Sequence, residues 1–384
     1  MAGLALAGDR TPRRSRPPGR CRATNTHERT RWVLERCREL GFALAGVARV
    51  GPMRHADEMR EWLAQGKHGS MAYLAEHARL KADASQMLEG ARCAIMVADL
   101  YATRNEPTDP VPNGHGRIAR YARGGDYHKA IKKRLHRLCD EMAERFSECQ
   151  TRAFVDTAPV HERELALAAG LGWVGKHTLM IHPKVGSWML LGGVLTTLDL
   201  EVNEHEEPDH CGTCTRCIDA CPTDAITPYS VDASRCISYL TIERREEIAV
   251  DLQRGIGEWV FGCDICQEVC PHNSPRDGDV GQRNVAYEPG RASFDLVDVL
   301  GWDEEARRAA FAGTALKRAK LGMMKRNAVI AAGNAVSRMG RGEPTSRVLL
   351  DALVRVRASE SEEREIRSLA DRTLAGLLDS LADE

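Results

Sequence analysis

The sequence predicts an α+β protein with more than one domain, and three observations lead to this class. Strand-like apolar runs alternate with helical patterns between residues 31 and 200, eight cysteines gather between residues 211 and 270, and helical apolar intervals return after residue 316. A chain of 384 residues is long enough for two or three domains. We expect a mixed α/β domain over residues 31–200, a cysteine-rich domain over 201–285 and a helical region over 286–384.

The first 30 residues differ from the rest, because arginines alternate with prolines and almost no large apolar side chain follows Leu6. Such a segment cannot bury a core, so we expect residues 1–30 to be a disordered basic tail or to precede the true start of the protein. An arginine-rich start also resembles an organelle transit peptide, but Pro17 and Pro18 would interrupt its amphipathic helix.

The 31–200 domain is expected to open with an amphipathic helix that ends at Gly41. Residues 94–100 form a short apolar run of strand type, and apolar residues recur at helical intervals over residues 131–146. Alternating elements of this kind are typical of a mixed α/β domain.

Eight cysteines carry the strongest signal in the chain. They lie in the runs CGTCTRCIDACP and GCDICQEVCP, with one more thiol between them, and both runs end in the C-x2-C-x3-C-P spacing of bacterial ferredoxins. In two-cluster ferredoxins the fourth cysteine of a run binds the other cluster. We therefore predict a ferredoxin-like domain with two 4Fe-4S clusters. Their ligands are Cys211, Cys214, Cys217 and Cys270 for one, and Cys221, Cys236, Cys263 and Cys266 for the other.

Other uses of these cysteines fit the spacing less well. Structural zinc sites normally pair two C-x2-C knuckles across a longer gap, and a disulfide framework needs no such regular runs. A radical enzyme that uses S-adenosylmethionine would need a C-x3-C-x2-C run, which neither segment contains.

Composition is that of a water-soluble chain, with 43% hydrophobic residues, 28% charged residues and a formal net charge of -1. No apolar stretch approaches the roughly 18 residues that a membrane span requires. We expect a cytoplasmic protein that has no membrane partner and acts as a monomer.

Asp156 is the first candidate for acid–base chemistry. It follows the strand-like segment Ala-Phe-Val and precedes Thr157, at a strand end where clefts commonly open. An ordinary aspartic acid is only ~0.1% protonated at pH 7, so a role as a proton donor would require burial that raises its pKa. The alternative is a structural role, in which Asp156 closes an Asx-turn or caps a helix that begins near Val160.

The C-terminal region has three stretches of helical apolar intervals, which begin near residues 329, 349 and 366. Short helices of this kind need to stack, as in HEAT-like repeats. Between residues 316 and 345, seven basic residues face only Glu343 as an acid, a bias that predicts contacts with nucleic-acid phosphates. They are Lys317, Arg318, Lys320, Lys325, Arg326, Arg338 and Arg341.

Together these segments resemble the epoxyqueuosine reductase family, the cobalamin-dependent iron–sulfur enzymes that complete queuosine at the wobble position of tRNA. The likeness spans residues 31–378. It rests on RYARGGDYH, VDTAPVHER, GLGWVGKHT, the two cysteine runs, CISYLTIE and KRNAVIAAGN in the family's order.

The resemblance implies that the mixed α/β domain binds cobalamin and that Asp156 lies over its cobalt face, where it protonates the epoxide oxygen. It also implies an external electron donor, and a tRNA anticodon stem-loop bound by the helical region. The residues expected to line the cofactor are Lys81, Ala119, Asp156, His177, Met180, Ser238, Ile265 and Cys266. The residues expected to approach tRNA are Arg163, Arg245, Arg318, Lys320 and Arg326.

This chain departs from the family's pattern at two of these positions. The family often has Arg-x-x-Pro where this chain has Lys81 to Ala84, and some members have a cysteine at the position of Ala119. Two other functions stay open: a cobalamin iron–sulfur reductase acting on a small molecule, as in reductive dehalogenases, and a plain ferredoxin-like electron carrier. The basic C-terminal helices disfavour the former, and the long segment ahead of the cysteines disfavours the latter.

Overall fold

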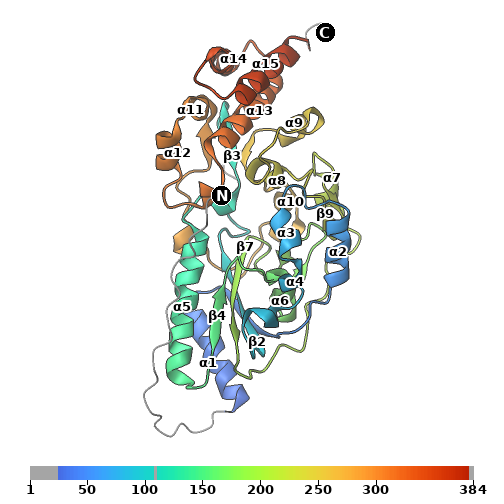
Figure 1. Cartoon of the computed structure of the whole chain (residues 1–384), viewed down its shortest axis with the longest axis vertical. Coiled ribbons are helices and arrows are strands. Elements are labelled where there is room, and N and C mark those ends of the chain that lie inside the picture. Colours follow the sequence, from blue (N-terminus) through green and yellow to red (C-terminus); the bar gives the residue numbers. More distant parts are fainter. Residues whose placement is uncertain (1–24, 108–109, 380–384) are drawn as a thin grey trace.

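The computed structural model describes residues 25–107 and 110–379. A mixed α/β part, a cysteine-rich part and a helical part follow one another along the long axis of the molecule (Figure 1). Residues 1–24 of the expected basic tail lie outside the described residues. Helix α1 (Thr26–Glu39) begins inside the range expected as tail, because the side chain of Asn25 caps it by accepting a hydrogen bond from the Glu28 amide.

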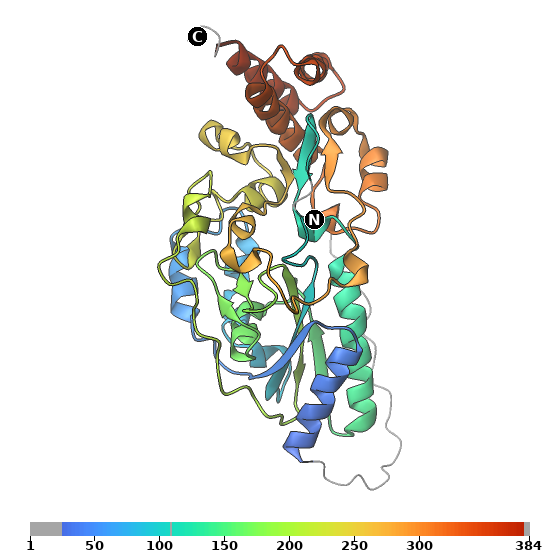
Figure 2. The same ribbon diagram turned by 180° about the vertical axis from the view of Figure 1, so that it is seen from behind.

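The centre of the mixed α/β part is a four-stranded antiparallel sheet in the order β1-β2-β7-β4. Its strands are β1 (Leu44–Arg49), β2 (Cys93–Leu100), β7 (Met189–Thr196) and β4 (Thr151–Phe154). Helices α1 and α5 (Tyr127–Arg145) cover one face, and α6 (Glu162–Ala168) covers the other (Figure 2). The predicted strand near residue 94 and the predicted helix over residues 131–146 are confirmed.

Strand β2 is buried on both sides, which explains its continuous apolar sequence. Ile95 and Val97 pack in the core that contains α1 and α5, whereas Ala94 and Met96 pack with α6. The sheet is thus packed on both faces, and this packing fixes the position of the end of β4 and of Asp156 just beyond it.

A second, three-stranded sheet joins the parts of the chain that the sequence divides into separate domains. Strand β3 (His115–Ile118) lies parallel to β10 (Trp259–Phe261) and antiparallel to β11 (Ser293–Asp295). The expected boundaries at residues 200 and 285 therefore do not separate independent sheets. Four residues of β3 are too short a run for their alternation to be recognised in the sequence.

The helical part contains α13 (Leu321–Met339), α14 (Pro344–Ala358) and α15 (Arg364–Asp379). These helices lie where the apolar intervals predict them, and α13 is buried along most of its length between β10, α11, α14 and α15. Their assignment to a HEAT-like repeat stays a prediction.

Shorter elements complete the described chain, and no described helix is long and apolar enough to cross a membrane. They are α2 (Ala56–Ala64), α3 (Ala72–Glu76), α4 (Ala78–Lys81), β5 (Trp173–Val174), β6 (Met180–Ile181), α7 (Arg216–Asp219), β8 (Ile226–Thr227), β9 (Ser230–Val231), α8 (Ile237–Ile242), α9 (Val250–Ile256), α10 (Ile265–Glu268), α11 (Leu296–Gly301) and α12 (Glu304–Ala310).

Candidate active site

A cleft of about 1160 Å³ lies where the mixed α/β part meets the cysteine-rich part, which is more than the roughly 300–1,000 Å³ of ordinary ligand pockets. Its walls come from the first turn of α5, the loop after β4, the strands around residue 180, the cysteine-rich segments and residues 314–318. The expected site residues that line it are Lys81, Asp156, Arg163, His177, Met180, Ser238, Arg245, Ile265, Cys266 and Arg318.

Asp156 is held in the cleft by its neighbours and does not act as a helix cap. Its Oδ2 atom accepts hydrogen bonds from the Tyr127 hydroxyl at 3.1 Å and from His128 Nε2 at 3.0 Å. Helix α6 begins only at Glu162, and its N-cap residue His161 makes no side-chain cap bond. Asp156 also has a φ of 48°, a left-handed conformation that is uncommon for a residue other than glycine. These features favour a functional role over the structural alternative.

The electrostatics of this carboxyl group differ from the expectation. The hydrogen bond from His128 lowers the pKa of Asp156, and burial of the carboxyl group only partly opposes that shift. The raised pKa that a proton-donor role would require is therefore not found, because the His128 bond outweighs the effect of burial. The neighbouring carboxyl group behaves differently, because burial and the charge of Asp156 raise the pKa of Glu162 to about 8. Glu162 Oε1 accepts the backbone N–H of Asp156 at 2.5 Å.

His177 is a second polar group in the cleft. It is only 3% exposed, and burial lowers its pKa to about 4, so the ring is neutral at pH 7. Its Nδ1 atom accepts the Leu179 amide at 3.2 Å, which places the ring proton on Nε2. That Nε2 has no hydrogen-bond partner among the described residues, so it is free to donate to a bound ligand.

Ala119 is not part of the cleft wall. It is 1% exposed and lies under Gly262, where a Cβ built on the glycine would come within 2.5 Å of the Ala119 Cβ. The expectation that Ala119 lines the cofactor is therefore corrected. Its place in the core also explains why the chain tolerates a residue without a reactive group at this position.

Four of the eight cysteines line the cleft, and we call them the inner thiols: Cys221, Cys236, Cys263 and Cys266. Burial raises the pKa of Cys263 well above its usual value, and the charges of Cys236 and Cys221 raise it further. Burial also raises the pKa of Cys266 well above its usual value, and the charges of Cys263 and Cys236 raise it further. These mutual effects indicate that the inner thiols lie near one another, and their assignment to one cluster stays a prediction.

The other four, which we call the outer thiols, are Cys211, Cys214, Cys217 and Cys270, and none is among the described residues that line the cleft. Burial raises the pKa of Cys270 to about 11, and the charges of Cys211, Cys217 and Cys214 add smaller increases. Cys217 also acts on the pKa of Cys266, so the two groups lie next to each other.

The expected tRNA-contacting cations fall into different environments. Arg163, Arg245 and Arg318 are exposed residues of the cleft wall, and Lys320 is exposed just outside it. Arg326 is 6% exposed and donates to the backbone carbonyls of Leu240, Arg244 and Glu246. It is thus engaged inside the protein, and the expectation that it contacts tRNA is corrected.

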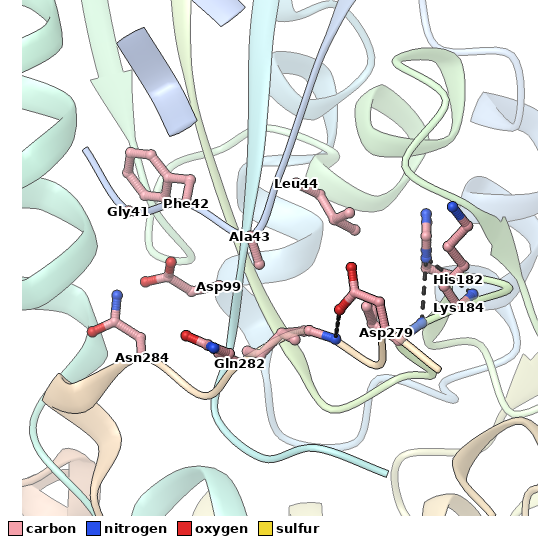
Figure 3. Close-up of a pocket in the computed structure, with 13 residues that line it drawn as sticks. Gly41, Phe42, Ala43, Leu44, Asp99, His182, Lys184, Asp279, Gln282 and Asn284 are labelled. Atoms are coloured by element: carbon pink, nitrogen blue, oxygen red, sulfur yellow. Dashed lines mark hydrogen bonds between the residues drawn. The ribbon is translucent and has the colours of Figure 1, made fainter. Parts of the chain in front are cut away.

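A second, smaller cavity of about 470 Å³ lies beside the first strand of the sheet (Figure 3). Its buried acid Asp99 accepts hydrogen bonds from Arg134 Nη1 at 3.0 Å and from the Tyr287 hydroxyl at 2.7 Å. His182 Nδ1 accepts the backbone N–H groups of Lys184 and Val185. Asp99 and His182 Nδ1 thus already have protein partners, as expected for a structural cavity.

Sequence reasoning missed the contribution of Tyr127 and His128, which lie in the first turn of α5 and line the cleft. The segment RYARGGDYH was recognised as glycine- and aromatic-rich, but no individual role followed from it. The available signal was Asp126, a helix N-cap residue that places the next two side chains at a helix end.

Comparison with known proteins supports a family assignment for this chain. Residues 81–157 match the family model described as "Epoxyqueuosine reductase QueG, DUF1730", and residues 210–273 match the "4Fe-4S double cluster binding domain". A protein named epoxyqueuosine reductase from Leadbetterella byssophila is 39% identical over 293 residues, which cover 75% of this chain and 93% of the relative. One of the same name from Gloeobacter violaceus is 40% identical over 311 residues, which cover 78% and 95%.

The chain belongs to the epoxyqueuosine reductase family. The resemblance inferred from the motifs is thereby confirmed. A solved epoxyqueuosine reductase with an epoxyqueuosine-modified tRNA-Tyr stem loop shares the fold of this family member, with a TM-score of 0.76 and 22% identity. That match covers 91% of this chain and 99% of the solved one.

Proposed function

We propose that this member of the epoxyqueuosine reductase family reduces epoxyqueuosine to queuosine at the wobble position of tRNA, with cobalamin in the cleft and two 4Fe-4S clusters as the electron path. One observation carries the proposal: the carboxyl group of Asp156 and the four inner thiols line the same cleft. A proton donor and an electron source therefore meet at one place.

The reaction sets the requirements. Conversion of an epoxide to an alkene breaks two carbon–oxygen bonds, consumes two electrons and two protons, and releases water. No side chain is a good two-electron reductant, so the electrons must come from cofactors and an external donor. The cluster held by the outer thiols would receive them, and the cluster held by the inner thiols would pass them toward the cleft.

The cleft residues fit a large cofactor with polar edges. The neutral His177 offers an unpartnered N–H, and Met180 and Ile265 add apolar surface to the wall. Ser238 and Lys81 supply polar groups on other sides of the cleft. When bound, cobalamin supplies a metal centre that accepts electrons one at a time and delivers them to a strained ring.

The tRNA partner is supported by charge at the cleft mouth and by the relative that binds a modified stem loop. Arg163, Arg245 and Arg318 are placed to contact phosphates near a base that enters the cleft. Such contacts fix the position of the stem-loop, while the modified base is recognised inside. Lys320 would add a contact outside the cleft.

The first test is replacement of Asp156 by Asn. The amide keeps the shape of the side chain but cannot transfer a proton, so we expect turnover of epoxyqueuosine tRNA to fall by about 10²–10⁴-fold. Iron, sulfide and cobalt contents and the affinity for the tRNA stem-loop should stay unchanged. Asp140→Asn, an exposed residue on α5, is the matched control.

The nucleosides of cells that lack the protein provide the second measurement. Accumulation of epoxyqueuosine in tRNA supports the proposal. A normal queuosine level, or full activity of the Asp156→Asn variant, would contradict it, and the former result would favour a small-molecule substrate instead.

A further inference from the structure

The acid function of Asp156 conflicts with its electrostatics. His128 and Tyr127 both donate to its Oδ2 atom, which stabilises the ionised carboxylate. An ionised carboxylate holds no proton to give to an epoxide. The proton must therefore come from a group that is in contact with Asp156.

His128 has the required contacts. Its Nε2 atom is 3.0 Å from Asp156 Oδ2, and its Nδ1 atom is 2.9 Å from Asp126 Oδ1. An ionised carboxylate can only accept hydrogen bonds, so an imidazole placed between two carboxylates donates from both nitrogens. This geometry selects the doubly protonated imidazolium.

The surroundings of His128 favour the same charge state. The hydrogen bond to Asp156 raises the pKa of His128, burial opposes this, and the bond to Asp126 raises the pKa again. The Tyr127 ring stacks on the imidazole with centroids 3.9 Å apart. Arg318 further lowers the pKa of Asp156, and the charge of Asp156 in turn acts on the pKa values of Glu162 and Lys81.

We propose that Asp126, His128 and Asp156 form a proton relay in which His128 is the proton reservoir and Asp156 passes its protons to the epoxide oxygen. The relay rests on the proposed function. One proton moves from His128 Nε2 through Asp156 as the first carbon–oxygen bond breaks and leaves a hydroxyl group. After His128 takes up a proton from solvent, a second proton converts that hydroxyl to water as the second bond breaks. The two electrons come from the external donor through the iron–sulfur clusters.

The structure allows proton uptake from solvent at His128 and proton delivery to the substrate from Asp156. His128 has a side chain that is 35% exposed, so it can exchange protons with solvent. All the side-chain bonds that Asp156 accepts from described residues end on Oδ2, so rotation of the protonated carboxyl group about its Cβ–Cγ bond can carry the proton received on Oδ2 to the substrate. Asp126 acts as a positioning residue, because its side chain also caps α5 by accepting the His128 amide at 3.1 Å.

The charge state of His128 can be measured without turnover. Diethyl pyrocarbonate reacts with the neutral imidazole of histidine and not with the imidazolium, and peptide mass analysis of the holoprotein reports the rate at each histidine. We expect the pH midpoint for His128 to lie above the value of about 6.5 that is usual for histidine. His136, an exposed histidine on the same helix, serves as the control for access of the reagent. Asp126→Asn should lower the His128 midpoint by about 1 pH unit, because asparagine keeps the cap but removes the charge.

The same variants test the relay in catalysis. A raised His128 pKa keeps the imidazolium present at higher pH, so kcat should fall as pH rises through that value, and Asp126→Asn should move this fall to lower pH. His128→Gln should lower kcat by about 10–100-fold with little change in KM, since glutamine keeps a donor toward Asp156 but carries no transferable proton. His136→Gln should match the wild type.

Three results would overturn the relay: a His128 midpoint at or below about 6.5, an unmoved pH limb in Asp126→Asn, or full kcat in His128→Gln. An unmoved limb near pH 8 would point to Glu162 as the titrating group. If the wild-type protein shows no turnover of epoxyqueuosine tRNA, the proposed function fails and the relay with it; turnover with an unmoved limb removes the relay alone.

Discussion

Two groups of cations, only a few residues apart in the sequence, have opposite environments in the structure. The front cations Lys317, Arg318 and Lys320 are exposed next to or at the cleft. The buried cations Lys325 and Arg326 lie in the first turns of α13 and are 9% and 6% exposed. Both groups contribute to the same basic stretch of the sequence, yet only the front cations can meet a phosphate.

The contrast between the two groups shows that basic residues occur in this stretch for two separate reasons. Lys325 forms an ion pair with Glu362 of the neighbouring chain segment, and Arg326 satisfies backbone carbonyls at the end of α8. The bonds of Arg326 join the helical part to the cysteine-rich part, whereas the Lys325 pair lies within the helical part. The front cations make one strong protein contact, the pairing of Arg318 with Glu243, whose side chain also lines the cleft.

Arg326→Met should have the largest effect on stability. The methionine fills much of the same volume but takes the donor away from the buried carbonyl of Leu240 and from the partly buried carbonyls of Arg244 and Glu246. We expect the free energy of unfolding to fall by about 3–5 kcal/mol, measured by urea denaturation of the anaerobic protein.

Arg326→Lys separates charge from hydrogen-bond geometry. A lysine keeps the positive charge but cannot span three carbonyls as the planar guanidinium does, so it should recover only part of the loss. Wild-type stability in Arg326→Met would mean that these carbonyls find other partners. In conditions where the variant is folded, its tRNA affinity should equal that of the wild type.

The double variant Arg318→Gln and Lys320→Gln should have an intermediate effect, on binding and not on stability. Loss of two phosphate contacts should weaken stem-loop affinity about tenfold and reduce the slope of log K against log salt concentration by about 1–2. Filter binding over a range of salt concentrations measures both quantities.

The matched control for this variant is Arg347→Gln with Arg355→Gln, which removes two exposed charges from α14, away from the described cleft wall. The control should bind tRNA like the wild type. Equal losses in both variants would show that net charge alone decides affinity, and an unchanged slope in the test variant would place the phosphates elsewhere.

Much of the fold could be predicted, because its signals are local. The apolar run of β2, the intervals of α5 and those of the three C-terminal helices each lie within one segment of sequence. The sheet that joins β3 to β10 and β11 could not be predicted, since its strands have three or four residues and their partners are more than a hundred residues away.

The site divides in the same way. Cysteine spacing indicated the two groups of thiols, and the strand end indicated Asp156. The sequence could not tell that His128 reaches Asp156 across 28 positions, nor that it reverses the expected shift of the Asp156 pKa. Burial of Arg326 was equally hidden, because its partners are backbone atoms, which any sequence provides.

Arg338→Gln should have the smallest effect of these variants, and it tests whether the tRNA surface extends along α13. Arg338 belongs to the basic stretch but is paired with Glu258 and donates to Asn113 Oδ1 at 3.1 Å, at the far end of α13 from the front cations. Its side chain is 54% exposed, and solvent-exposed pairs contribute only about 0–1 kcal/mol, so the urea midpoint should shift little. Stem-loop affinity and its salt slope should not change, because Arg338 lies away from the cleft wall that contains Arg318. A tenfold loss of affinity in this variant would extend the tRNA surface along α13 and would end the distinction between front cations and the rest of the basic stretch.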